Sequence, residues 1–425
     1  MLDAMYIRKQ PEAVREKLAR RGFDVDFQPF LNDDAERRRL IGETESLKAE
    51  RNRVSASIPL LKKAGNDISA ELARMRDVGD QIKELDGELL LVNTRMSDFL
   101  DRLPNLPADD VVPGGKENNE VIYTWGEKPE FDFEPKHHVE LVTQLRMIDY
   151  ERGAKLAGSG YWIYQGMGAR LEWALLSFFI DRHLADGYEM MLLPHIVSYE
   201  CGYTSGQFPK FEEDIFRVSD GSDTFRFLLP TAETALASLY RDEILPEAEL
   251  PKKLFAYTPC YRREAGSYRA DERGMIRGHQ FNKIEMFQYV VPADTDRALD
   301  ELTEKAADLV RSLGLHFRVS KLAAEDCSAS MEKTLDVEVY IPSMGGYKEV
   351  SSASSAGAYQ ARRGNIRYRS SETGKPEFLH TLNASGLATS RLIPAIVEQF
   401  QEADGSVRIP TVLQPYLGGL EWIRP

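Results

Sequence analysis

The chain has 425 residues, of which 42% are hydrophobic, so it can build a large core and is expected to hold two domains. Its formal net charge of −14 at pH 7 argues against a protein that coats nucleic acid by global attraction, and any contact with RNA must come from a local basic surface. Three widely spaced cysteines, no apolar run of membrane-spanning length and no signal-peptide core predict a cytoplasmic protein without disulfides and without a membrane partner.

Residues 31–103 are predicted to form two long helices, because apolar residues recur in both at heptad spacing. The Gly-Asn-Asp turn at 65–67 predicts that they fold back on each other as an antiparallel coiled coil. Pro59 is expected to break or kink the first helix near its end. Such an arm can be a dimerisation or spacer element, or it can reach a distant part of a large ligand. Its basic residues are interleaved with acids, so charge alone permits RNA contact without demanding it.

A linker rich in proline and glycine, residues 104–115, ends the arm, and helices and strands are mixed after it. Helices are expected at residues 137–154, 169–186 and 295–313, and strands at 189–193, 226–229, 255–261, 281–290, 336–341 and 346–351. Because the two do not alternate regularly, an α+β fold with an antiparallel sheet flanked by helices is favoured over a doubly wound sheet. The expected domains are a helical arm, residues 1–110, and a second domain, residues 111–425.

The richest cluster of chemically active side chains lies in residues 262–285. Six of its side chains stand out, three arginines, one aromatic residue and two carboxylates: Arg262, Arg273, Arg277, Phe281, Glu264 and Glu285. Arginine forks suit phosphate oxygens, an aromatic face suits stacking, and carboxylates accept hydrogen bonds from amines or hydroxyls. The segment is either a solvated charged hairpin or one wall of a site for a nucleotide and a small amino compound. No glycine-rich phosphate loop is present, so arginines would have to hold any nucleotide phosphates.

The order of residues in this segment resembles motif 2 of the class II aminoacyl-tRNA synthetases, specifically of the seryl-tRNA synthetase family. Residues 381–391 resemble motif 3, although alone they could be a strand end and a helix start. Residues 229–233 resemble the loop that grips the amino group of serine, and residues 346–352 resemble the strand that holds metal and nucleotide. Residues 187–194 occupy the place of motif 1, where two subunits pair. Together the matches cover essentially the whole chain, arm included.

The resemblance implies ATP-dependent activation of L-serine to seryl-adenylate and transfer of the seryl group to tRNA(Ser), and to tRNA(Sec) where present. The implied catalytic residues are Arg262, on the α-phosphate of ATP, and Arg391, on the outer phosphates and adenine. The implied ATP-binding residues are Arg262, Arg263, Glu264, Arg277, Phe281, Glu349, Val350, Ser351, Ser352 and Arg391. The implied serine-binding residues are Thr231, Ala232, Glu233, Arg262, Glu285, Asn383 and Ser385. Glu349 and Ser352 match the magnesium ligands, no zinc is expected, and a homodimer would form through motif 1.

Three features depart from the usual form of the motifs. Residues 353–359 replace a run that commonly contains cysteines and an aspartate, Asn282 stands where an acid is usual, and Thr389-Ser390 replace a common Val-Gly. They leave open a specialised paralogue that supplies seryl-tRNA to a biosynthetic pathway. A relative that loads a carrier protein is disfavoured by the arm, and a non-catalytic RNA-binding relative is disfavoured because the motif arginines and glutamates are retained.

Overall fold

The computed structural model describes residues 1–264 and 274–425, so the predicted arginine Arg273 lies outside the described residues. The described chain forms two compact units. One comprises Leu2–Ala19 and Phe23–Pro104, and the other comprises Met1, Arg20–Gly22 and Asn105–Pro425. No helix among the described residues combines the length and apolar character needed to cross a membrane.

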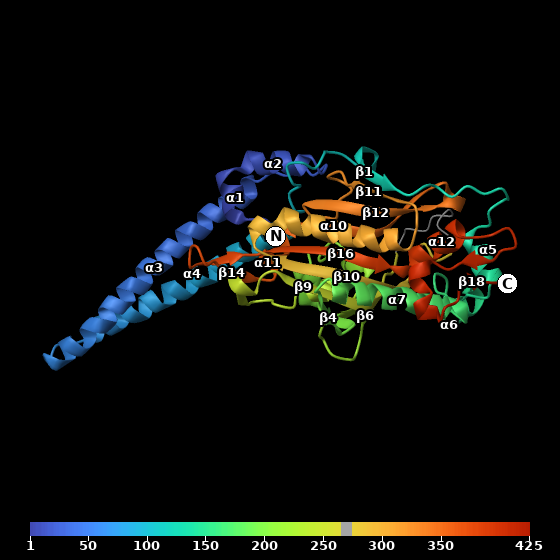
Figure 1. Cartoon of the computed structure of the whole chain (residues 1–425). Helices are drawn as coiled ribbons and strands as arrows, with labels where there is room; N and C mark the ends of the chain where they lie inside the picture. The colour runs from blue at the N-terminus through green and yellow to red at the C-terminus, as the bar shows by residue number, and fades with distance from the viewer. Residues whose placement is uncertain (265–273) are drawn as a thin grey trace. The chain divides into compact units, whose positions relative to one another are not determined.

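The first unit is helical and contains α1 (Ala4–Lys9), α2 (Pro11–Ala19), α3 (Gln28–Lys63) and α4 (Ser69–Asp101). The long helices α3 and α4 lie side by side along their length, which confirms the predicted antiparallel pair (Figure 1). Residues at heptad positions are buried between them, among them Leu40, Ile82 and Val92. Of the two effects expected of Pro59, a break is excluded, because α3 runs through this residue to Lys63. Packing against α4 and the position of the proline in the last two turns explain why the usual cost of an internal proline is tolerated.

The second unit is built on an eight-stranded sheet with the order β1-β11-β12-β13-β16-β10-β9-β4. Its strands are β1 (Glu120–Trp125), β4 (Glu189–Met191), β9 (Lys252–Tyr261), β10 (Gln280–Val290), β11 (Phe317–Lys321), β12 (Lys333–Ile341), β13 (Gly346–Gly357) and β16 (His380–Ala388). Only the β4–β9 pair is parallel within this sheet, and all other neighbours are antiparallel. The predicted α+β class is confirmed.

Three helices pack against one face of this sheet and form the main core with it: α7 (Met167–Ala185), α10 (Thr295–Ser312) and α12 (Thr389–Gln399). The single helix predicted at 137–154 is wrong. The chain instead forms α5 (His138–Gln144) and α6 (Tyr150–Ala157), with the short strand β2 (Ile148–Asp149) between them. Arg146 has a φ of 52°, a left-handed conformation that no right-handed helix can continue through.

Smaller elements complete the second unit. They are α8 (Tyr199–Thr204), α9 (Glu233–Leu236), α11 (Tyr359–Arg363), β3 (Ile163–Tyr164), β5 (Ile196–Ser198), β6 (Phe216–Val218), β7 (Arg226–Leu228), β8 (Ile244–Pro246), β14 (Arg367–Arg369), β15 (Pro376–Phe378), β17 (Val407–Arg408) and β18 (Trp422–Ile423). A second apolar core joins residues of α9 and α11 to Phe287 and Tyr289 of β10.

Strand alternation decides which residues of β10 and β16 can form a site. Ile284 and Met286 of β10 point into the core under α7, α10 and α12. Phe281, Lys283 and Glu285 therefore point to the opposite side, which we call the site face. On β16, Leu382 and Ala384 enter the helical core, which leaves Thr381, Asn383 and Ser385 on the site face.

Candidate active site

The site face carries a buried group of polar side chains around the ammonium of Lys283. The Lys283 Nζ lies 2.5 Å from Glu285 Oε2 and donates to Thr231 Oγ1 at 2.7 Å. Asn383 Nδ2 donates to Glu285 Oε1 at 2.9 Å, and Ser385 Oγ donates to Glu285 Oε2 at 3.5 Å. Four residues that were predicted to bind serine are thus brought together by three separate chain segments.

Glu233, the first residue of α9, adds a second carboxylate to this pocket and is only 9% exposed. Gln360 Nε2 donates to Glu233 Oε1 at 2.8 Å and to the Ser205 carbonyl at 3.0 Å, while Gln360 Oε1 accepts from Thr381 Oγ1 at 2.7 Å. Burial, and then the charge of Glu285, raises the pKa of Glu233 to about 7. The pocket therefore holds a carboxylate that favours the arrival of a cation.

The predicted residue Ala232 differs from its neighbours, because its side chain is fully buried in the second apolar core. It fills space behind the pocket, and only its backbone is left to contact a ligand.

Arg262 directly follows β9 and stands at the edge of the same pocket. Its guanidinium carbon lies 5.2 Å from the centre of the Phe281 ring, and its Nε donates to the Pro230 carbonyl at 3.4 Å. Arg263 points elsewhere, since its Nη1 donates to the Glu213 carbonyl at 2.9 Å. A stacked, permanently charged fork beside buried carboxylates can hold an anionic group next to an ammonium group.

Two further predicted ATP-binding residues form an ion pair with each other. Arg277 Nη1 lies 2.5 Å from Glu264 Oε2, and both side chains are mostly buried. Glu264 has a φ of 49°, a left-handed conformation that is uncommon outside glycine. The Arg277 fork is therefore oriented by a carboxylate before any ligand binds.

Arg391, in the first turn of α12, reaches the strand that was predicted to hold metal and nucleotide. Its Nη1 donates to the Glu349 carbonyl at 2.7 Å and lies 3.6 Å from Glu349 Oε2. Its Nε donates to the Ile276 carbonyl at 3.4 Å. The structure thus joins motif 3 to the strand at 346–352.

Acidic oxygen atoms gather on the neighbouring strand β12. Asp336 lies opposite Ser352, and Glu338 lies opposite Glu349. Asp336 Oδ1 is buried and has no hydrogen-bond partner among the residues that the structure describes. Burial, and then the charge of Glu349, raises the pKa of Asp336 well above its ordinary value. An unpaired oxygen and mutually repelling carboxylates beside a hydroxyl fit a hard divalent cation such as magnesium.

Two predicted ATP-binding residues are not brought into this cluster by their side chains. Val350 is 1% exposed and packs in the core under α7, α10 and α12. Ser351 is fully buried, and its hydroxyl donates to the Ser385 carbonyl at 2.7 Å. The bulge between Val337 and Glu338 of the partner strand accompanies this change of face.

Three residues of the site were not among the predicted ones: Lys283, Gln360 and Asp336. Strand alternation from Phe281 to Glu285 could have identified Lys283, because it shares their parity. Nothing local marks the other two, since their partners lie far away in the sequence.

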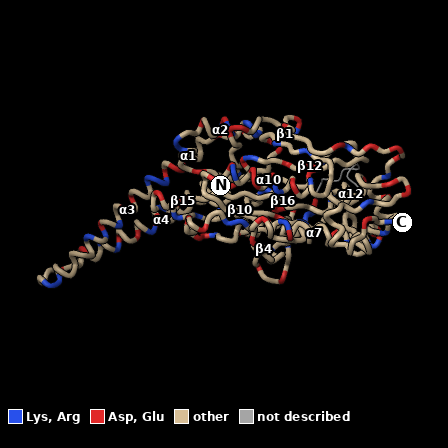
Figure 2. The backbone as a smooth tube through the Cα atoms, viewed as in Figure 1, with Lys and Arg blue, Asp and Glu red and all other residues tan. Residues whose placement is uncertain are grey.

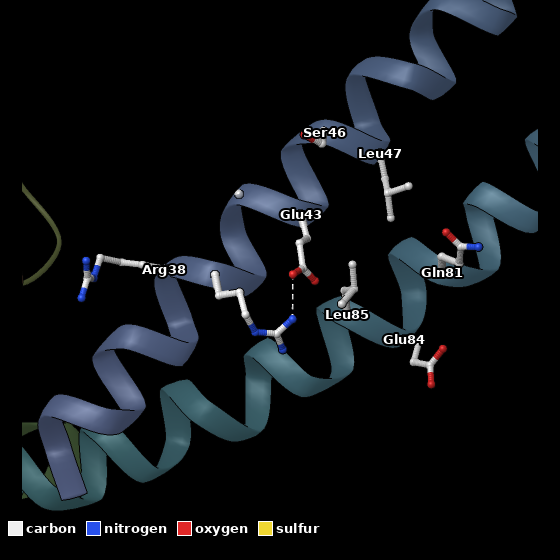
Figure 3. A pocket seen from close by; sticks show the side chains of 9 residues that line it. Arg38, Glu43, Ser46, Leu47, Gln81, Glu84 and Leu85 are labelled. Carbon is white, nitrogen blue, oxygen red and sulfur yellow. Dashed lines mark hydrogen bonds and ion pairs between the residues drawn. The ribbon is translucent and has the colours of Figure 1, made fainter. Parts of the chain in front are cut away.

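The arm carries a separate hollow between α3 and α4 (Figure 3). It is lined by Arg38, Arg39, Gly42, Glu43, Ser46, Leu47, Gln81, Glu84 and Leu85. Arg39 is neutralised there, with its Nη1 2.7 Å from Glu43 Oε1 and its Nη2 2.8 Å from Glu36 Oε1. The outer part of α3, residues 51–63, is different: it carries Arg51, Arg53, Lys62 and Lys63 and no acid (Figure 2). None of these four cations makes an ion pair within the described chain.

Comparison with known proteins supports the same interpretation of both units. Residues 1–107 match the model of the seryl-tRNA synthetase N-terminal domain, and residues 216–400 match that of the class II tRNA synthetase core domain (G, H, P, S and T). Serine–tRNA ligase 2 of Clostridium acetobutylicum is 58% identical over 98% of this chain and 99% of its own length. Serine–tRNA ligase of Geotalea uraniireducens is 47% identical over the full length of both.

Solved structures agree with the sequence relatives. The seryl-tRNA synthetase of Pyrococcus horikoshii, complexed with ATP, superposes with a TM-score of 0.91 at 33% identity and covers all of both chains. The cytoplasmic serine–tRNA ligase of Naegleria fowleri, in complex with AMP, superposes with a TM-score of 0.86 at 27% identity, over 100% of this chain and 99% of its own. The resemblance inferred from the motifs is confirmed along the whole chain. The chain belongs to the seryl-tRNA synthetase family of class II aminoacyl-tRNA synthetases.

Proposed function

We propose that this enzyme activates L-serine with ATP and transfers the seryl group to tRNA. The observation that carries the proposal is the buried pocket in which Glu233, Glu285 and Asn383 lie beside the Arg262 fork. The ammonium of serine would contact Glu233 and Thr231. Its hydroxyl would contact Glu285 and Ser385. These assignments leave the serine carboxylate directed toward Arg262.

In the first step the serine carboxylate oxygen attacks the α-phosphorus of ATP. A bond forms between that oxygen and phosphorus, the bond to the bridging β-phosphate oxygen breaks, and pyrophosphate leaves. Arg262 stabilises the charge that develops on the α-phosphate. No protein nucleophile is needed, so catalysis depends on positioning and electrostatic stabilisation. In the second step the terminal ribose hydroxyl of tRNA attacks the seryl carbonyl and AMP leaves.

The remaining ATP contacts follow from the pairs already present in the protein. Arg277 and Arg391 would bind the outer phosphates, with ATP phosphates replacing Glu264 as the acceptor for Arg277. Phe281 and Arg391 would enclose adenine, with Glu264 and the backbone of 349–352 beside it. Magnesium would be held by Glu349 and Ser352, with Asp336 adjacent. When bound, it supplies neutralisation of the phosphate charge.

Exchange of radiolabelled pyrophosphate into ATP tests the first step directly. Exchange is expected with serine and not with alanine or glycine, because an amino acid without the hydroxyl cannot donate to the buried carboxylate of Glu285 that the pocket presents to it. Threonine is excluded only by its extra methyl group and is expected to be the strongest competitor. Exchange that depends on another amino acid, or none at all, would contradict the proposal.

The two units suggest a division of labour. We assign residues 1–110 to a tRNA-binding arm and residues 111–425 to the catalytic domain, with tRNA(Ser), and tRNA(Sec) where present, as the substrate. The acid-free segment 51–63 of α3 supports the assignment, because unpaired cations are what phosphate contacts require. A non-catalytic relative is not favoured, since the arginines and carboxylates of the site are all present, and nothing in the site favours a specialised paralogue.

Replacing Arg51, Arg53, Lys62 and Lys63 together by glutamine is expected to raise KM for tRNA and leave serine-dependent exchange unchanged. Each phosphate that is no longer neutralised should reduce the slope of log affinity against log salt by about 0.7–0.9. The matched control neutralises four acids of α4, Glu71, Asp77, Asp80 and Glu84, and should not raise KM. Deletion of residues 33–102 should likewise spare exchange and abolish charging. Charging that survives both changes would make the arm only a spacer.

A homodimer through the motif 1 region completes the proposal. Four large apolar side chains on α7 and around β4 are at least 48% exposed: Trp173, Leu184, Leu192 and Ile196. Exposed apolar side chains on α7 and next to the edge strand β4 fit a subunit interface. The free cysteines of the described chain fit the cytoplasm as the compartment.

A further inference from the structure

Two departures from the usual motifs converge on one oxygen atom. Asn282 and Thr389 are 107 residues apart, yet both donate to Glu172 Oε1. The distances are 2.7 Å from Asn282 Nδ2 and 2.6 Å from Thr389 Oγ1. In both cases the usual residue could not donate a hydrogen bond here, because an ionised carboxylate at position 282 and a valine at position 389 have no side-chain N–H or O–H group.

The carboxylate that they hold is buried. Glu172, on α7, is 3% exposed, and Thr389 is fully buried. Tyr257, on β9, donates its hydroxyl to Asn282 Oδ1 at 3.1 Å and so fixes the orientation of the amide. Glu172 Oε2 and the Tyr164 hydroxyl, both buried, have no hydrogen-bond partner among residues 1–264 and 274–425. A buried carboxylate with so few donors depends strongly on the two that it has.

This cluster lies behind the proposed nucleotide site. Strand alternation puts Asn282 on the helical side of β10, while its neighbours Phe281 and Lys283 face the site. Thr389 opens α12, two residues before Arg391. Thr389 Oγ1 also lies 3.2 Å from the Asn282 carbonyl, so the motif 3 helix is bonded directly to the motif 2 strand. One carboxylate thus spans α7, β10 and α12.

We propose that Glu172 is a positioning residue, which through Asn282 and Thr389 fixes the spacing between Phe281 and Arg391 on either side of adenine. This inference rests on the proposed function, because it assigns adenine to that space. Glu172 touches no substrate. Disturbing it should loosen the adenine pocket and leave the serine pocket, on other residues of β10 and β16, largely intact.

The test exchanges the acid and the amide between positions 172 and 282. The single variant Asn282→Asp places two carboxylates within hydrogen-bond distance of each other. The double variant adds Glu172→Gln, so that one acid and one amide again face each other. The single variant is expected to raise KM for ATP, and the Kd for ATP by calorimetry, about tenfold, with KM for serine little changed. The double variant is expected to return both ATP values to within about threefold of the original, because the amide introduced at position 172 can then donate to the new acid.

A second variant covers the possibility that Asn282→Asp does not fold. Thr389→Val removes one donor without changing volume and should raise KM for ATP by up to about tenfold. Its control is Thr303→Val on α10, which removes a buried hydroxyl whose one hydrogen bond among residues 1–264 and 274–425 goes to the Leu299 carbonyl, and which should not change KM for ATP. Equal effects of Thr389→Val and Thr303→Val, or no rescue in the double variant, would overturn the inference. Absence of serine-dependent exchange in the unmodified protein would instead overturn the proposed function.

Discussion

Replacing Arg262 by alanine is expected to lower kcat of serine-dependent exchange by about 10²–10³-fold, the effect of removing one preorganised donor from a developing charge. The fork is held over Phe281 and anchored on the Pro230 carbonyl before any ligand arrives, so it needs little reorganisation during the reaction. Arg262→Lys should recover only part of the loss, because an ammonium cannot form two parallel hydrogen bonds to phosphate. Initial rates of pyrophosphate exchange at saturating serine and ATP give the measurement.

The matched control is Arg297→Ala on α10, whose side chain is 73% exposed and pairs with Asp294. It should change kcat by less than about twofold, as expected for an exposed ion pair. If Arg262→Ala raised KM for ATP and left kcat unchanged, the residue would contribute uniform binding instead of stabilising the transition state. If neither value changed, the assignment of Arg262 to the α-phosphate would be wrong.

The sequence predicted correctly those elements whose pattern of apolar residues is repeated within one segment of the chain. The heptads of α3 and α4 are repeated many times, so they predicted both helices correctly. The break between α5 and α6 depends on one left-handed residue, Arg146, which periodicity does not encode. Its detection needs the tertiary structure.

The same distinction applies to the candidate site. Thr231, Glu285 and Asn383 could be proposed from ordered motifs, and the structure brings them together. Gln360 and Glu172 could not, because their polar partners lie 127 and 217 residues away in the sequence. A buried polar side chain is explained only by the acceptor or donor that it meets after folding.

Lowering the pH from 8 to 6 is expected to raise KM for serine about tenfold. The pKa of Glu233, raised to about 7 by burial and by Glu285, leaves the carboxylate mostly ionised at pH 8 and mostly protonated at pH 6. Only the ionised form attracts the serine ammonium, so the apparent affinity falls with the ionised fraction. Glu233→Gln should raise KM at pH 8 and remove the dependence on pH. The measurement is KM for serine at several pH values, with KM for ATP followed in parallel.

The same carboxyl group should also make the free energy of unfolding depend on pH. The direction is opposite to that of an acid whose pKa is lowered on folding. Its pKa is raised from 4.5 to about 7 on folding, so its favourable contribution is complete below pH 4.5 and is lost as the pH rises through 7. The loss is on the order of 3 kcal/mol at pH 8. Glu233→Gln should therefore be more stable than the original chain at pH 8 while binding serine less well.

Glu172 is the control for both effects, because burial also raises its pKa to about 7. Replacing Glu172 by glutamine should, like Glu233→Gln, make the chain more stable than the original at pH 8. The pH dependence of KM for serine should remain in this variant. If Glu172→Gln removed that dependence and Glu233→Gln kept it, the titrating group would lie behind the sheet and not in the serine pocket. Retention of the dependence in both variants would exclude both carboxylates. Only its selective loss in Glu233→Gln links the serine ammonium to the carboxylate that Gln360 holds in place.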